Sequence, residues 1–144
     1  MKKEVFYLIF LVFFFSCRDG TLAMDKGFSL MVYNYSSNDI YAYLADGGQH
    51  TAYPDTLLSA AFPGIGNSSV PLIPKGLSWP FRSNQNWKDR VLSLPRDTLS
   101  IFILSPDTLS KYSWDVIRVK NKILKRYDLS VADLEKTGYN VYYP

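Results

Sequence analysis

The chain has 144 residues, with 16 lysines and arginines against 13 aspartates and glutamates, and a formal net charge of +3. It has no basic run, so we expect no binding to nucleic acid, which needs clustered positive charge. A single cysteine excludes a disulfide within one copy of the chain. Stability must therefore come from a hydrophobic core, and the length suffices for one domain.

The N-terminus has the layout of a secretory signal. Two lysines precede an apolar run over residues 5–15, and Ser16 and Cys17 follow it. A membrane-spanning helix needs about 20 apolar residues. The run is too short to span, so we expect residues 1–16 to be a signal peptide that is removed.

Phe14, Phe15, Ser16 and Cys17 resemble the lipobox of bacterial lipoproteins, in which the cysteine takes a thioether-linked diacylglycerol and its freed amine is acylated. Phe14 replaces the usual leucine, a laxity associated with Bacteroidota. The resemblance implies a covalent lipid on Cys17, no other cofactor, and signal-peptidase recognition through Phe14, Phe15 and Ser16. Several acyl chains anchor a protein stably, whereas one binds marginally. The alternatives are a plain secretory peptide and a buried core thiol.

Residues 17–27 are expected to form a lipidated tether, because they mix polarity and show no periodicity. Ten residues of chain reach at most about 36 Å when stretched. The tether would therefore hold a single globular domain, residues 28–144, close to the membrane. Loss of two lysines and one glutamate with the signal peptide lowers the net charge from +3 to +2.

Residues 28–45 carry the first strand pattern. Apolar side chains alternate on both sides of the turn-forming residues 36–39, which predicts an antiparallel hairpin. One face would be aliphatic and the other would carry Tyr33, Tyr35, Tyr41 and Tyr43. The tyrosine face is either a binding surface or a set of cross-strand pairs under a second layer.

Six prolines and five glycines between residues 46 and 96 limit regular structure to short pieces. We expect a weak strand within residues 68–73 and a short helix from Asn86 to Leu92. His50 is the only histidine, so it lacks the partners of a metal site, and no nucleophile motif lies near it. We therefore predict no catalytic residue, no metal ligand and no enzyme activity.

Trp79 and Trp87 flank a polar loop in this region. Indole rings beside guanidinium and amide donors are typical of sugar binding, which makes candidates of Trp79, Trp87, Arg82 and Asn84. The alternative is that both indoles close the open end of a sheet core, since tryptophan is mostly buried.

The C-terminal third has the clearest pattern. The apolar run Leu99–Leu104 predicts a central strand buried on both faces. A helix from Ser113 to Asn121, a strand over 123–129, a helix capped by Ser130 and a last strand over 139–143 follow. The sequence thus predicts a β-dominated α+β fold with a small antiparallel or mixed, sandwich-like sheet and two or three short helices.

The segments DTLSIFI (97–103), YSWD (112–115) and LKRYDLS (124–130) resemble a family of short Bacteroidota lipoproteins without an assigned activity. This resemblance implies an envelope location and implies no mechanism. We expect a lipid-anchored protein, at the outer membrane on either leaflet, whose domain is a non-catalytic binding or structural module for a neighbouring envelope protein. The alternative is a glycan-binding surface lipoprotein that uses its exposed tryptophans and tyrosines.

Overall fold

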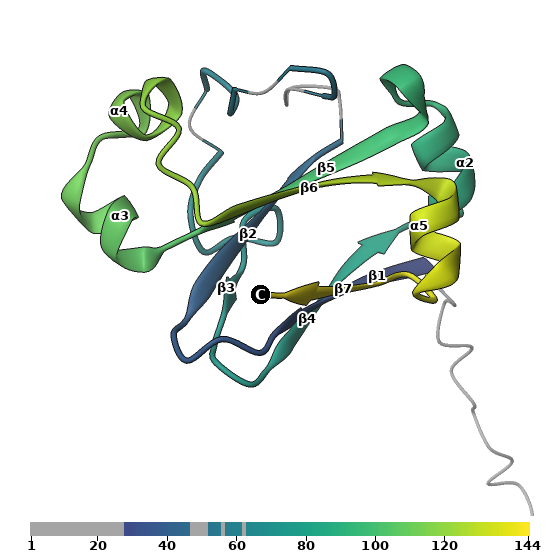
Figure 1. Ribbon diagram of the computed structural model, residues 1–144, viewed down its shortest axis with the longest axis horizontal. Helices are drawn as coiled ribbons and strands as arrows, with labels where there is room; N and C mark the ends of the chain where they lie inside the picture. Colours follow the sequence, from purple (N-terminus) through teal and green to yellow (C-terminus); the bar gives the residue numbers. More distant parts are fainter. Residues whose placement is uncertain (1–27, 47–51, 56, 62) are drawn as a thin grey trace, which may run out of the picture.

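The structure is a computed structural model that describes residues 28–46, 52–55, 57–61 and 63–144. Two β-sheets with short helices at both ends form the fold (Figure 1). Cys17, Phe14, Phe15, Ser16 and His50 lie outside these residues. The strands are β1 (Phe28–Asn34), β2 (Ile40–Ala45), β3 (Leu72–Ile73), β4 (Ser78–Ser83), β5 (Thr98–Leu104), β6 (Lys125–Ser130) and β7 (Asn140–Tyr143). The helices are α2 (Trp87–Leu92), α3 (Pro106–Lys111), α4 (Trp114–Val119) and α5 (Val131–Lys136), with a 3-10 turn, η2 (Pro95–Asp97).

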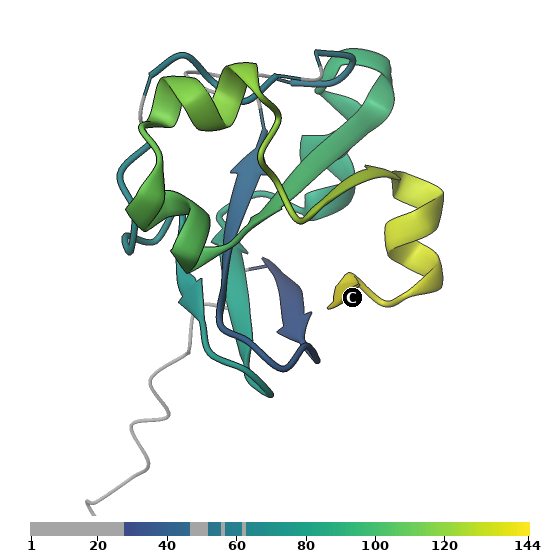
Figure 2. The same cartoon turned by 60° about the vertical axis from the view of Figure 1, so that its left-hand side comes forward.

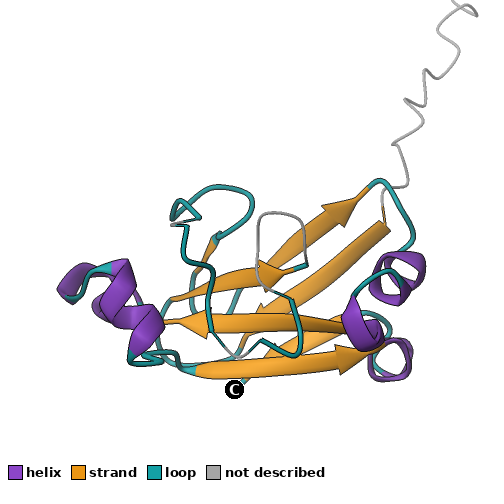
Figure 3. Cartoon of the chain, turned by 90° about the horizontal axis from the view of Figure 1, so that it is seen from above, coloured by secondary structure: helices purple, strands orange, loops and turns teal. Residues whose placement is uncertain are grey.

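One sheet has the strand order β4-β1-β7 and the other β3-β2-β5-β6. The first is mixed, because β1 pairs antiparallel with β4 and parallel with β7. The strands run between two helical ends, with α3 and α4 at one end and α2 and α5 at the other (Figures 1 and 3). This architecture confirms the predicted β-dominated α+β class. None of the helices described here is long and apolar enough to cross a membrane.

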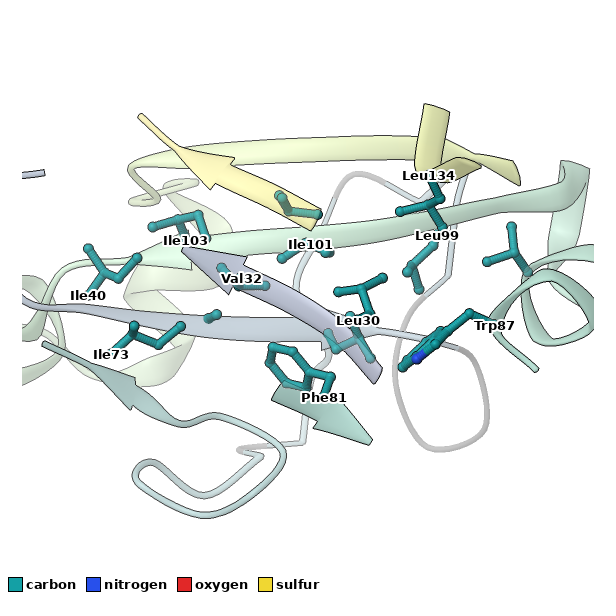
Figure 4. Packing of buried hydrophobic residues seen from close by; sticks show 14 of the residues in the cluster. Leu30, Val32, Ile40, Ile73, Phe81, Trp87, Leu99, Ile101, Ile103 and Leu134 are labelled. Atoms are coloured by element: carbon teal, nitrogen blue, oxygen red, sulfur yellow. The ribbon is translucent and has the colours of Figure 1, made fainter. Parts of the chain in front are cut away.

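The main core fills the space between the sheets (Figure 4). Strand β5 contributes Leu99, Ile101 and Ile103 to it, while Phe102 and Leu104 enter a second cluster on the far side of the same strand. This confirms the prediction of a central strand buried on both faces. The second cluster is closed by α4 and by residues of the 52–70 segment, including Leu58 and Val70.

The predicted hairpin of residues 28–45 is wrong, because β1 and β2 belong to different sheets. Residues 35–39 form an arch between the sheets instead of a turn within one. The apolar alternation is the same in both arrangements, since Leu30 and Val32 still face Ile40 and Ala42 across one core.

The predicted tyrosine face is split for the same reason. The sides of β1 and β2 that face away from the shared core point in opposite directions. Tyr43 is buried in the second cluster and Tyr41 packs against it, whereas Tyr35 is exposed on the outside of the three-stranded sheet.

Strand β4 is missing from the sequence prediction, which reads residues 79–87 as a loop bounded by two tryptophans. Pro80 lacks a backbone N–H, which argues against a central strand but suits the edge position that β4 occupies. Trp79 and Arg82 are therefore strand residues.

Two of the three predicted N-cap side chains make a cap hydrogen bond, whereas the Ser113 side chain makes none at the start of α4. The Asn86 side chain accepts a hydrogen bond from the Lys88 N–H at the start of α2, and Ser130 forms a capping box with Asp133. The additional helix α3 begins at Pro106, which both ends β5 and suits the first position of a helix. The described residues therefore contain four short α-helices where two or three are predicted.

Candidate ligand-binding site

A pocket of about 540 Å³ lies beside the free edge of β4, and we call it the β4 pocket. Three of the four predicted ligand-binding residues line it: Trp79, Arg82 and Trp87. The other lining residues are Leu44, Asp46, Ser68, Ser69, Pro80, Phe81 and Arg90. Asn84 is exposed beyond the end of β4 and is not among them.

Trp87 belongs to the core and forms the inner wall of the pocket. Its residue is only 2% exposed, and its indole N–H donates to the carbonyl of Phe28 at 3.2 Å. This is the second of the two alternatives for the indoles, a ring that closes the core, and it leaves little of the Trp87 ring open to a ligand. Its position as the first residue of α2 turns it inward.

Trp79 differs from Trp87 in its exposure. Trp79 stands opposite Val32 in the β4–β1 register. Its indole therefore lies on the same face of the sheet as the core residue Val32. The residue is half-buried and packs against the rim of the main core. Part of the indole remains open, and Trp79 is the aromatic residue of this pair that can contact a ligand.

Arg90 and Asp46 form a partly buried ion pair in the pocket wall. Their side chains are 31% and 14% exposed. The Arg90 guanidinium lies 5.1 Å from the centre of the Trp87 ring and donates to the Ser83 hydroxyl at 3.4 Å. Burial lowers the pKa of Arg90, yet an arginine remains charged at neutral pH. The pocket therefore contains a fixed pair of opposite charges.

The free edge of β4 supplies backbone groups to the pocket. Pro80 stands opposite Met31 in the register and cannot donate a hydrogen bond, so this pair is a non-hydrogen-bonded one. In such a pair the backbone N–H and C=O groups point away from the partner strand, and the same holds two residues on either side. The backbone N–H and C=O groups of Ser78 and Arg82 therefore point away from β1. The site thus offers an indole face, a guanidinium, serine hydroxyls and the edge amide of Arg82, which suits a polar ligand with a flat apolar side.

A second aromatic feature lies outside the three-stranded sheet. Tyr142 stacks on Tyr33 with ring centres 5.2 Å apart and on Tyr35 with ring centres 5.9 Å apart. Tyr35 is 64% exposed. These three rings form a tyrosine cluster on the outer face of the sheet, and part of it is open to the solvent.

The described part of the chain contains no group of three or more His, Cys, Asp or Glu residues that could hold a metal ion. Comparison of the chain with protein-family models, with curated proteins and with solved structures gives no match in any of the three. The resemblance to Bacteroidota lipoproteins therefore stays a prediction.

Proposed function

We propose that the protein is a lipoprotein of the cell envelope, anchored at the outer membrane by a lipid on Cys17, and that its folded domain is a non-catalytic binding module. The observation that carries this proposal is the signal pattern of residues 1–17. The position of β1 supports it, because this strand begins at Phe28, eleven residues after the cysteine. A tether of that length holds the domain next to the lipid surface.

Processing of a Cys17→Ala variant in the native host tests the anchor. The wild-type chain should incorporate radiolabelled fatty acid and sediment with membranes. The variant should incorporate none, keep its signal segment and change its fractionation, whereas an Arg18→Ala control should behave as wild type. Equal processing and fractionation of all three chains would contradict the proposal.

A second candidate function is glycan binding at the β4 pocket. The specific observation in its favour is the convergence of Trp79, Arg82 and the Arg90–Asp46 ion pair on one pocket. Sugar rings combine an apolar face with hydroxyl groups, and this lining complements both parts.

Calorimetric titration of the protein with a panel of neutral and acidic oligosaccharides tests the second candidate. Binding should disappear in Trp79→Ala and persist in Tyr35→Ala, which removes an exposed ring from the tyrosine cluster. Absence of heat for the whole panel at millimolar concentration would reject glycan binding and leave the anchored module as the proposal.

A further inference from the structure

The end of the domain formed by α3, α4 and the turn after α4 combines exposed apolar and cationic side chains. The apolar residues, with their exposed fractions, are Tyr112 (43%), Val116 (37%), Val119 (64%) and Leu124 (47%). The cations are Lys111, Lys120 and Lys125, which are exposed, and Arg118 and Lys122, which are half-buried. We call this set of nine residues the α3–α4 surface. The two helices lie next to each other at one end of the molecule (Figure 2).

The charge of the domain is concentrated at this end. Residues 105–125 contain five cations and two carboxylates, Asp107 and Asp115, and so carry +3. Residues 28–144 as a whole carry +2. The rest of the domain is therefore slightly acidic, and the positive potential belongs to the α3–α4 surface.

None of the cations of this surface is held in an ion pair with another described residue. Within the described residues the ion pairs are those of Lys88, Arg90 and Arg126, and none involves the five cations of the α3–α4 surface. Lys122 instead lies over the Tyr112 ring, with its Nζ atom 4.3 Å from the ring centre. This contact links the turn after α4 to the end of α3 and places a charge beside an exposed aromatic ring.

We infer that the α3–α4 surface rests on an anionic lipid bilayer. Exposed aromatic and aliphatic side chains enter the headgroup layer, while lysine and arginine attract lipid phosphates, and each part strengthens the other. An acidic protein would satisfy the charges as well. Protein interfaces, however, gather apolar residues in a core depleted of charge, whereas Val119 and Leu124 alternate with lysines.

The geometry allows this surface and the proposed lipid on Cys17 to touch one membrane. The start of β1 lies at the α2 end, where Trp87 binds the Phe28 carbonyl. Strand β5 connects that end to α3 (Figure 1), and its seven residues span about 23 Å. Eleven residues of tether reach at most about 40 Å, which exceeds that span. Two contacts at opposite ends would hold the long axis of the domain along the membrane.

Hydrogen–deuterium exchange of the full chain on lipid nanodiscs tests the inference. The protein is combined with discs of phosphatidylcholine alone or with discs of phosphatidylcholine and phosphatidylglycerol in equal parts. Amides of residues 111–125 should exchange several-fold more slowly on the anionic discs. A Lys120→Glu/Lys122→Glu variant should lose this protection, and raised ionic strength should reduce it.

The control is Lys88→Glu/Lys136→Glu, which makes the same charge change at exposed lysines of α2 and α5, at the opposite end of the domain, and should keep the protection. Equal exchange on the two kinds of disc would overturn the inference and favour an acidic protein as the occupant. Retention on phosphatidylcholine discs reports the acyl anchor separately, because neutral headgroups carry no net charge. If the protein is not retained on phosphatidylcholine discs, exchange is compared with both kinds of disc in excess, and this comparison still tests whether the α3–α4 surface binds anionic lipid.

Discussion

Asn34 joins the two sheets through a hydrogen bond from its amide Nδ2 to the carbonyl of Ile73, 3.0 Å away. Asn34 ends β1 in one sheet, whereas Ile73 lies in β3 of the other. The same amide nitrogen donates to the Asn38 carbonyl at 2.8 Å, and the amide oxygen accepts from the Ser36 N–H at 3.0 Å. The side chain is fully buried, so it holds the arch that sends β1 and β2 into different sheets.

Replacement of Asn34 by alanine should therefore destabilise the fold strongly. Two carbonyls and one N–H would lose the side-chain partner that Asn34 gives them, and loss of such partners costs about 3 kcal/mol in total. Urea unfolding measures the effect. Asn38→Ala is the control, because its exposed side chain makes only a 3.4 Å contact with the Ser37 hydroxyl. Similar small effects of the two changes would contradict the role assigned to Asn34.

The two tryptophans of the β4 pocket should differ in their contribution to stability. Trp87→Ala removes a buried ring and a hydrogen bond to Phe28 and should lower the free energy of unfolding by about 4 kcal/mol. Trp79→Ala should lower it by about half as much, because part of the Trp79 ring is already open to the pocket. Thermal and urea unfolding of both variants checks the order, and a larger loss from Trp79→Ala would refute it.

The Arg90–Asp46 ion pair should show a measurable coupling energy. The pair is partly buried, so the interaction is less screened than at a fully exposed site, and about 1 kcal/mol is expected from a double-mutant cycle. Arg90→Met and Asp46→Asn provide the single variants, and their combination completes the cycle. Additive effects of the two changes would show that the pair contributes nothing to stability.

The capping box of α5 should make stability sensitive to acid. The Ser130 hydroxyl donates to the Asp133 carboxylate at 2.6 Å and the Ser130 N–H donates at 2.9 Å. These bonds, the hydroxyl first, lower the pKa of Asp133 below its ordinary value of 3.8. The stability that the carboxylate supplies is present above the unfolded-state pKa and is lost as the pH falls through the lower folded-state pKa.

Unfolding measured from about pH 5 to about pH 2 tests this linkage. Wild type should lose more stability on acidification than Asp133→Asn, because the amide does not titrate. Parallel pH profiles for the two proteins would show that the Ser130–Asp133 bonds do not act on stability.

Local sequence patterns predict the individual strands and helices of this fold better than they predict which strands pair with each other. The run Leu99–Leu104 reveals a strand buried on both faces, and the Ser130 cap reveals α5, because each signal lies within a few residues. The alternation of residues 28–45 fits a hairpin and an arch equally well. The choice depends on Asn34 meeting Ile73, 39 positions away, and no local pattern contains that contact.

The candidate site is predicted in part for the same reason. Aromatic and basic residue types identify Trp79, Arg82 and Trp87, and these do converge on one pocket. Trp87 is the first residue of α2, and its ring points into the core. Asp46 and Arg90 are missed, because they meet only when β2 and α2 pack at one end of the sheets.

Intact-mass analysis of the protein isolated from the membrane fraction tests the central claim most directly. The account predicts a chain that begins at Cys17 and carries a diacylglyceryl group on its sulfur and an acyl group on its amine. A bare thiol at Cys17, or a mature N-terminus at another residue, would contradict it.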